Sequence, residues 1–325
     1  CEATQGKVRI MPVVDLWNTN YYIIDTYGKL VAAKPERKCR VMKKLFFLAS
    51  AFAIFCANAD DWFVANTGSD ENNDGKDWDH CFATIKKGIA SASDGDTVWV
   101  EDGYVSGSDI APASGTSLID VNKAITLRSA SGYVDEANVK GATIRGYQPD
   151  GLVTNAASQL STARRGVQLA AGASLVGFVV EKGASPATYR GGGVYGAGTS
   201  SVVSNCVVRD NVGCYGGGGL YNVAVYYSLI TNNLSCRCGG GGFQCDFYNC
   251  DIIGNTDVST SGNDGGGGGA VDANVYNCRL IGNVAKTSYG GALRGYQKSG
   301  LVCRDSTICG NKAPSGGGFY SSSGT

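Results

Sequence analysis

Hydrophobic and polar positions alternate in short runs along the second half of the chain, and these runs repeat. Each run follows a block of glycines that ends in an apolar residue, and these apolar residues lie on average 25 positions apart. They are Val194, Leu220, Phe243, Ala270, Ala292 and Phe319. A run such as Cys250-Asp-Ile-Ile-Gly-Asn255 is too short for a helix and alternates with a period of two. The pattern therefore predicts short β-strands that recur about every 25 residues.

The alternating runs share residue types position by position. Small residues open the runs, at Cys206, Ser228, Cys250, Cys278 and Ser306. An asparagine closes each run, at Asn211, Asn233, Asn255, Asn283 and Asn311. Stacked coils bring equivalent positions next to one another. The repeats therefore predict two structural ladders, one of small cysteine and serine side chains and one of asparagines.

A single coil of this length cannot bury its own apolar face, but stacked coils can. Glycine and asparagine tolerate left-handed backbone conformations and mark the corners between strands. We therefore expect a solenoid over residues 96–325, truncated at the C-terminus, with about ten coils. Residues 60–95 are expected to cap it, because Ile85, Ile89 and Ala92 share one face of a short predicted helix. Such a helix covers the open apolar end of a solenoid.

The segment from Met42 to Ala59 has the features of a processing signal. Two lysines follow Met42, then an apolar run reaches Ala57, and Ala57-Asn58-Ala59 forms a small-x-small cleavage site. The run is too short to span a bilayer comfortably. We therefore predict a signal peptide at residues 42–59 and a secreted or cell-surface protein. Residues 1–41 are interpreted as an upstream extension outside the native protein.

Composition narrows the class of partner. Glycine occurs 48 times, yet 43% of the residues are hydrophobic and only 17% are charged, which excludes a disordered chain. Residues 60–325 hold 19 Lys and Arg against 24 Asp and Glu, a net charge of −5. A mildly acidic body without a basic run argues against nucleic acid or an anionic membrane surface as partner. No transmembrane helix is expected in the mature part.

The motifs resemble those of a known superfamily. The Gly-Gly-[Gly/Ala]-apolar blocks and their asparagines are similar to the repeats of parallel β-helix proteins of the pectate-lyase-like superfamily. The likeness is greatest to the glycine-rich repeats of polymorphic outer-membrane proteins. It covers about residues 62–325, and it includes Phe63–Asp70, Phe82–Ile89 and Gly95–Val100 as an entry segment. The resemblance implies an all-β fold, a right-handed parallel β-helix, and specifies activity far less than fold.

Two groups of residues are candidates for binding. Tyr226, Tyr248 and Tyr276 occupy one repeat position, with Arg304 next in line. They predict an aromatic column, which either stabilises the sheet by stacking or offers a platform for sugar rings. Asp70, Asn72, Asp74 and Asp77 match the first half of a calcium loop, but Cys81 stands where the closing glutamate belongs. The alternative to calcium is a polar turn that leads into the cap helix.

The sulfur and imidazole groups favour structural roles. Cys214, Cys236, Cys238 and Cys245 lie near predicted corners and are disulfide candidates in an exported chain, with no pairing fixed by the sequence. His80 is the only histidine and has no partner motif, which disfavours histidine-based nucleophilic catalysis.

Two functions remain. The first is a non-catalytic adhesion or carbohydrate-binding protein whose partner is a polysaccharide, a cell-surface glycan or a protein. The alternative is a polysaccharide lyase or glycoside hydrolase acting on acidic polysaccharide, which needs clustered carboxylates. The aspartates of the regular repeats occupy different repeat offsets, at Asp210, Asp246, Asp251, Asp272 and Asp305. This scatter favours the first function, and no catalytic residue is assigned.

Overall fold

The chain divides into two compact units, residues 1–57 and 58–325. The computed structural model describes residues 59–106, 117–138, 140–148, 163–185, 189–260, 265–298 and 301–321 of the second unit, and the backbone of residues 21–24 and 30–33 of the first. In the first unit β1 (Tyr21–Ile24) pairs antiparallel with β2 (Leu30–Ala33), a pairing that the sequence did not predict. The predicted signal peptide lies outside the described residues, except for Ala59.

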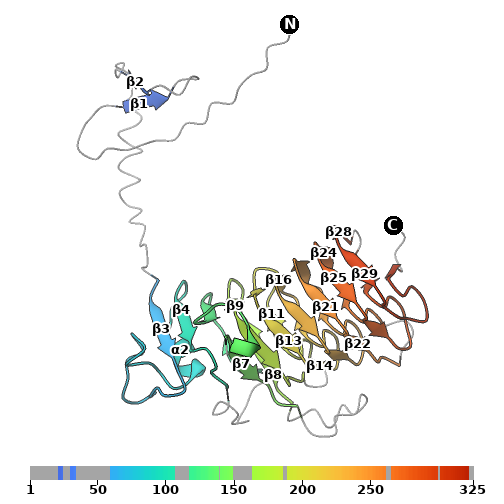
Figure 1. Cartoon of the computed structure of the whole chain (residues 1–325), viewed down its shortest axis with the longest axis horizontal. Coiled ribbons are helices and arrows are strands. Elements are labelled where there is room, and N and C mark those ends of the chain that lie inside the picture. The colour runs from blue at the N-terminus through green and yellow to red at the C-terminus, as the bar shows by residue number, and fades with distance from the viewer. Residues whose placement is uncertain are drawn as a thin grey trace. The chain divides into compact units, whose positions relative to one another are not determined.

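The second unit is a right-handed parallel β-helix with one short α-helix among its described residues, which confirms the predicted fold (Figure 1). Its strands form three long sheets and one short sheet, in which neighbouring strands come from successive coils and run parallel.

Sheet 1 contains nine strands, and this number sets the length of the solenoid at about nine coils. They are β3 (Asp61–Val64), β4 (Thr97–Val100), β6 (Thr126–Ser129), β9 (Ser174–Val176), β12 (Val202–Ser204), β16 (Ala224–Tyr226), β20 (Asp246–Tyr248), β24 (Asn274–Tyr276) and β28 (Cys303–Arg304).

Sheet 2 contains seven strands. They are β7 (Ala142–Arg145), β10 (Phe178–Glu181), β13 (Val207–Arg209), β17 (Leu229–Thr231), β21 (Asp251–Ile253), β25 (Arg279–Ile281) and β29 (Thr307–Cys309). A 3-10 turn, η1 (Glu136–Asn138), precedes β7.

Sheet 3 contains eight strands and sheet 4 contains four. The strands of sheet 3 are β5 (Ser117–Val121), β8 (Arg165–Leu169), β11 (Val194–Gly196), β15 (Leu220–Tyr221), β19 (Gly242–Phe243), β23 (Ala270–Val271), β27 (Leu293–Gly295) and β30 (Phe319–Ser321). Those of sheet 4 are β14 (Val212–Gly213), β18 (Leu234–Ser235), β22 (Thr256–Asp257) and β26 (Val284–Ala285).

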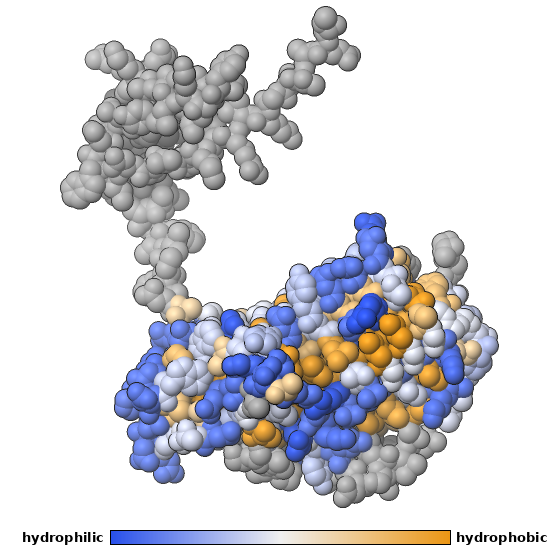
Figure 2. All heavy atoms as spheres, viewed as in Figure 1, coloured by the Kyte–Doolittle hydropathy of each residue, from blue (hydrophilic) through white to orange (hydrophobic). Residues whose placement is uncertain are grey.

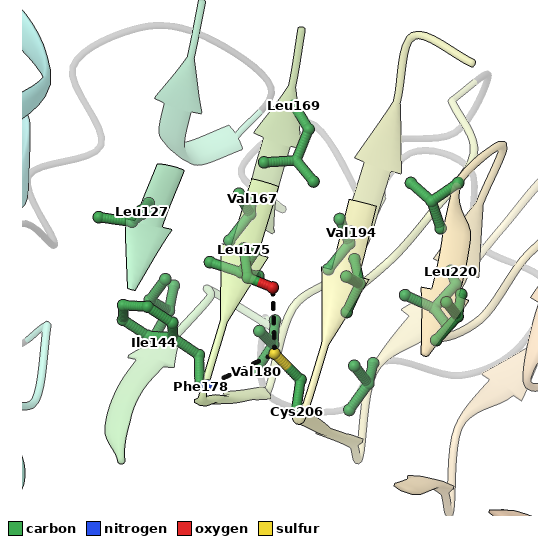
Figure 3. Packing of buried hydrophobic residues seen from close by; sticks show 14 of the residues in the cluster. Leu127, Ile144, Val167, Leu169, Leu175, Phe178, Val180, Val194, Cys206 and Leu220 are labelled. Atoms are coloured by element: carbon green, nitrogen blue, oxygen red, sulfur yellow. Dashed lines mark hydrogen bonds between the residues drawn. The ribbon is translucent and has the colours of Figure 1, made fainter. Parts of the chain in front are cut away.

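Each regular coil runs through sheet 3, sheet 1, sheet 2 and sheet 4 in turn. The inward residue of each strand stacks on its equivalent in the next coil, as Val203, Val225 and Phe247 do in sheet 1. These three side chains are fully buried. Figure 3 shows the same packing nearer the N-terminal end, where Leu175, Val180 and other labelled side chains from neighbouring strands fill one core. The alternation in the sequence thus becomes a continuous apolar column.

The repeat alignment slips by one residue at one coil. Phe243 was expected to be equivalent to Leu220, but the structure pairs Gly242 with Leu220 and turns Phe243 to the outer face. A Cβ atom at Gly242 would lie 2.7 Å from Cζ of Phe247, so the Phe247 ring fills the space that a side chain at Gly242 would need. Phe247, in the next strand of the same coil, therefore fills the core volume that a large side chain at position 242 would have filled.

Ladders of side chains follow the corner between sheet 2 and sheet 4. The Oδ1 atom of Asn255 accepts hydrogen bonds from the backbone nitrogen and Nδ2 of Asn233, both at 3.0 Å. Asn255 in turn donates from Nδ2 to Oδ1 of Asn283 at 3.0 Å and to the carbonyl of Ile230 at 2.9 Å. The same bonds link every neighbouring pair from Asn211 to Asn311. This ladder satisfies buried backbone groups that strands of two or three residues leave unpaired.

The small-residue ladder lies at the corner between sheets 1 and 2. The backbone nitrogen of Cys206 donates to Oγ of Ser228, and that of Cys278 donates to Oγ of Ser306. Cys250 donates in the same way to Sγ of Cys278 at 3.4 Å. Cys206, Ser228, Cys250 and Cys278 are buried, whereas Ser306, in the last coil, is half-buried.

The cap helix α2 (Ile85–Ser91) begins at the N-cap residue Thr84 and buries Ile85 and Ile89. Both of its ends are held by charged side chains. Asp70 accepts hydrogen bonds from the backbone nitrogens of Ala83 and Thr84, at 2.8 and 3.0 Å, and Lys123 donates to three carbonyls at the C-terminal end. Opposite charges at the two ends match the helix dipole. Strand β3 belongs to sheet 1, so the expected cap segment already contributes to the solenoid.

Left-handed residues mark the corners, and one of them is strained. Asn205, Asn249 and Asn277 adopt φ near +50° at the corner between sheets 1 and 2, and Tyr227 adopts φ 48° at the equivalent position. Tyrosine lacks the local hydrogen bonding that makes this conformation tolerable for asparagine, and 62% of the Tyr227 side chain area is exposed.

We therefore expect Tyr227→Asn to raise the free energy of unfolding by about 0.5–1 kcal/mol. Denaturant unfolding of the full chain measures this difference. The reverse exchange, Asn249→Tyr, is expected to lower the free energy of unfolding by a similar amount. A lower stability of Tyr227→Asn would contradict the strain argument, because it would mean that the exposed ring contributes more than its backbone conformation costs.

Candidate functional site

A pocket lies at the corner between sheets 3 and 1, and differences in coil length create it. Three successive coils turn this corner with only two residues, at 222–223, 244–245 and 272–273. The coils on either side use longer connections, residues 197–201 and 296–302. The short corners form the floor of a notch of roughly 300 Å³, and Thr199 on one side and Gln297 and Lys298 on the other form its walls. It is lined by Thr199, Asn222, Gln244, Asp246, Asp272, Gln297 and Lys298.

The Asp272 carboxylate anchors one wall of the pocket. Its Oδ1 atom accepts hydrogen bonds from the backbone nitrogens of Tyr296, Gln297 and Lys298, at 2.7, 3.0 and 3.2 Å. Only 1% of Asp272 is exposed. Three backbone donors are a strong cradle for an ionised carboxylate. Asp272 therefore positions the long connection, and its lone pairs are largely occupied by the protein.

Asp246 is the second carboxylate that lines the pocket. Its Oδ1 atom accepts a hydrogen bond of 2.8 Å from Nδ2 of Asn274 and lies 3.6 Å from Nζ of Lys298. Gln244 accepts a hydrogen bond from the Tyr221 hydroxyl through Oε1 at 3.0 Å, which directs its amide. The pocket thus combines an amide, a carboxylate and an ammonium group, a set that both donates to and accepts from sugar hydroxyls.

The tyrosine column crosses the outer face of sheet 1 beside this pocket. Tyr226, Tyr248 and Tyr276 are in register with one another, and Arg304 follows Tyr276 in the last coil. Asp246 and Tyr248 are two residues apart on β20, so both point outward from the same strand. The pocket and the column therefore form one surface, which we call the sheet 1 flank.

The rings of the column stack on each other. Their centroids are 4.8 Å apart between Tyr226 and Tyr248 and 5.0 Å apart between Tyr248 and Tyr276, with planes inclined by 9° and 4°. Each inner ring face is thus covered by a neighbouring ring, and a sugar ring cannot lie on it. The edges and hydroxyls remain accessible, and within the described residues none of the three hydroxyls donates to or accepts from another protein group. The column stabilises the sheet and presents a row of hydroxyls.

The environment of Tyr248 differs from that of an isolated phenol. Partial burial raises the pKa of Tyr248, and the negative charge of Asp246 raises it further. The hydroxyl therefore stays protonated and remains a hydrogen-bond donor beside a carboxylate that accepts.

The chain is similar to two solved polysaccharide lyases. One is the pectate lyase Pel9A, with 16% sequence identity, a TM-score of 0.46, and coverage of 75% of this chain and 72% of that one. The other is a rhamnogalacturonan lyase, with 16% identity, a TM-score of 0.37, and coverage of 81% of this chain and 62% of that one. No family model and no curated protein matches the sequence. Likeness at this level carries no argument about activity.

Three of the four predicted calcium residues accept hydrogen bonds from backbone nitrogens. Asp70 holds the start of α2, as described above. Asp74 accepts a hydrogen bond from the backbone nitrogen of Lys76 at 3.1 Å. Asp77 accepts one from the backbone nitrogen of His80 at 2.7 Å, and its side-chain hydrogen bond raises the pKa of the His80 imidazole. Nowhere in the described ranges do three Asp, Glu, His or Cys side chains gather closely enough to hold a metal ion. Calcium binding by Asp70, Asn72, Asp74 and Asp77 stays a prediction without this geometric support.

Among the aspartates of the regular repeats, the structure brings Asp246 and Asp272 into one pocket. Repeat offsets alone did not predict this, because Asp272 lies at a corner and Asp246 begins a strand. Asp251 instead forms an ion pair with Arg279 on the outer face of sheet 2. A hydrolase needs one carboxyl group that donates a proton and a second that attacks or activates water. Asp272 is a poor candidate for the second role, since three backbone donors already bind it.

The outer faces of sheets 2 and 3 carry different side chains. On sheet 3 the outward rings of Tyr195 and Tyr221 are covered by the buried Arg165, 4.6 Å from the Tyr195 ring, and by Arg190, 5.1 Å from the Tyr221 ring. Burial lowers the pKa of Arg165 to about 10. Figure 2 shows an apolar band over the outer face of sheet 2. Half-buried aliphatic side chains lie there, at Val207, Leu229, Ile253 and Ile281.

Proposed function

We propose that this protein is an exported, non-catalytic β-helix that binds a polysaccharide or cell-surface glycan along the sheet 1 flank. The observation that carries the proposal is the continuity of the polar pocket with the row of tyrosine hydroxyls through Asp246 and Tyr248. A flat row of donors and acceptors beside a notch suits an extended ligand that is rich in hydroxyl groups. The Lys298 charge is balanced by Asp246.

Export is part of the proposal and rests on the predicted signal peptide at residues 42–59. The likeness of the glycine-rich repeats to those of polymorphic outer-membrane proteins supports a place at the cell surface. No helix in the described part of the chain has the length and apolar character that a membrane crossing requires.

The proposal is tested by passing the full chain over immobilised xylan, galactan, polygalacturonate and alginate, with calcium and with a chelator. We expect retention on at least one polymer and no release of reducing or unsaturated ends. Product formation would overturn the non-catalytic assignment and favour the lyase or hydrolase alternative. No retention on any polymer would favour a protein partner.

A single hydroxyl in the column gives a sharper result. We expect Tyr248→Phe to weaken retention about three- to tenfold, because one hydrogen bond is lost while the ring stack is preserved. Affinity electrophoresis in gels that contain the retained polymer measures the change. The control is Tyr227→Phe, which removes an exposed hydroxyl outside the column. Equal affinities of the two variants would show that the column hydroxyls do not contact the ligand.

A further inference from the structure

Two cysteines of neighbouring coils lie side by side on the outside of sheet 4. Val212 and Gly213 of β14 pair in register with Leu234 and Ser235 of β18. Cys214 and Cys236 follow these strands directly, so they occupy equivalent positions in adjacent coils. Neighbouring strands of a sheet are about 4.8 Å apart, which lies within the range of Cα separations that a disulfide bridges. Both side chains pack against the same small apolar cluster, which includes Val212.

We propose that Cys214 and Cys236 form a disulfide that clasps two coils of the solenoid together. The proposal concerns how the scaffold is locked, and it is independent of the glycan-binding function. The ten cysteines of the described residues are free in this structure, and the clasp joins two of them.

Accessibility distinguishes this pair from a second pair with the same stacking. Cys250 and Cys278 also lie in adjacent coils, where the backbone nitrogen of Cys250 donates to Sγ of Cys278, but only 1% and 2% of their areas are exposed. Cys214 and Cys236 are half-buried at the edge of a small apolar cluster that includes Val212. A dissolved oxidant reaches the half-buried pair and not the pair in the core.

Nearby thiols do not compete for the bond. Cys238 is two residues from Cys236 but is buried, and its Sγ atom contacts the carbonyl of Tyr215 at 3.8 Å. The backbone nitrogen of Cys214 donates to Oγ of Ser185 at 3.0 Å, which fixes the chain next to the thiol. The surroundings thus leave each of the two cysteines one neighbouring thiol as partner.

The chemistry is thiol–disulfide exchange with a small disulfide such as oxidised glutathione. The neighbouring Cys214 thiol lowers the pKa of Cys236, whereas Cys236 and burial raise the pKa of Cys214. The Cys236 thiolate attacks one sulfur of the oxidant, and the first glutathione leaves as a thiolate that takes up a proton. Cys214 then loses its proton and attacks Sγ of Cys236, which releases the second glutathione. Two protein thiols become one disulfide, and one oxidised glutathione becomes two reduced molecules.

Trypsin separates the two pairs cleanly, which makes the test direct. Cleavage after Arg209, Arg237 and Arg279 gives a fragment 210–237 with Cys214 and Cys236, and a fragment 238–279 with Cys238, Cys245, Cys250 and Cys278. The folded full chain is incubated with oxidised glutathione, alkylated in denaturant with excess iodoacetamide and digested with trypsin. The masses of the fragments are then measured by mass spectrometry. We expect fragment 210–237 to be two hydrogens lighter than its reduced form and unalkylated. Fragment 238–279 is expected to carry four alkyl groups.

A cysteine variant and the thermal stability test the disulfide independently. Cys214→Ser is expected to trap glutathione on Cys236, because the resolving thiol is gone. Oxidation of the unmodified chain is expected to raise its Tm by about 5 °C, and reduction to reverse this. Complete alkylation of fragment 210–237 would overturn the proposal. Equal oxidation of both fragments would also overturn it, because it would show that accessibility and position do not select this pair.

Discussion

Asn255→Ala is expected to lower the free energy of unfolding by about 4 kcal/mol. The substitution removes the Oδ1 atom that accepts from the backbone nitrogen and Nδ2 of Asn233, and it removes the donor to the carbonyl of Ile230. All of these groups are buried, so no water replaces the lost partners. An unsatisfied buried polar group costs about 1–3 kcal/mol, and the substitution leaves two of them, since Nδ2 of Asn233 keeps its hydrogen bond to the carbonyl of Val208. Denaturant unfolding of the full chain measures the effect.

The control for this substitution is Asn249→Gly. Asn249 is exposed and left-handed, with φ 55°, and glycine adopts that conformation without strain. We expect a change within about 1 kcal/mol. If Asn255→Ala costs no more than this control, the asparagine ladder is not what holds the short strands together.

Asp257→Asn is expected to stabilise the protein by about 3 kcal/mol above neutral pH. Asp257 is fully buried in β22, and burial raises the pKa of its carboxyl to about 7, although hydrogen bonds from Ser259 and Gly266 act in the opposite direction. Its Oδ1 atom accepts from the backbone nitrogen of Gly266 at 2.9 Å, and Oδ2 has no hydrogen-bond partner within the described residues. Asparagine keeps the acceptor and removes the charge.

The pH dependence has a definite sign. The pKa of Asp257 is higher in the folded protein than the ordinary value of 3.8, so folding favours the protonated form. The stability linked to this group is complete below about pH 4 and is lost as the pH rises toward 7. Asp257→Asn is therefore expected to match the unmodified chain near about pH 4 and to exceed it at about pH 8.5.

Urea unfolding across this range, compared with Asp210→Asn as control, measures the difference. Asp210 is a half-exposed aspartate at a left-handed corner, and its substitution is expected to leave the shape of the curve unchanged. If the free energies of unfolding of Asp257→Asn and of the unmodified chain changed in parallel with pH, this would contradict the assignment of Asp257 as the titrating group.

The ladders could be predicted because their residues recur at fixed offsets. Asn211, Asn233 and Asn255 are 22 residues apart, and in a stacked solenoid equal offsets mean adjacency. The tyrosine column follows from the same reasoning. The orientation of its rings does not, because it depends on side-chain torsions that a repeat pattern does not encode. The structure shows that neighbouring rings cover each other's faces, which replaces a stacking platform with a row of hydroxyls.

The pocket could not be predicted from offsets. It exists because the connections at 197–201 and 296–302 are longer than the two-residue corners between them. Its two carboxylates meet only because Asp272 lies at a corner and Asp246 at the start of a strand in the neighbouring coil. Unequal coil lengths were visible in the sequence, but which corner absorbs the extra residues was not.

The calcium motif shows a different limit of prediction from the sequence. The spacing of Asp70, Asn72 and Asp74 is that of a metal loop, yet Asp70 turns toward the N-terminus of α2. A helix end with unpaired backbone donors competes with a cation for the same carboxylate. The sequence contains both partners, and only the folded arrangement shows which one Asp70 contacts.

Binding by the sheet 1 flank is tested most directly by removing one ion pair from each of two faces and comparing retention on the same polysaccharides. The double variant Asp246→Ala and Lys298→Ala removes the pair in the pocket, and Asp251→Ala with Arg279→Ala removes a matched pair from sheet 2. Neither changes the net charge. We predict at least about tenfold weaker retention for the pocket variant and less than about twofold for the other. Equal retention of the two, or a larger loss for the sheet 2 variant, would show that the sheet 1 flank is not the binding surface.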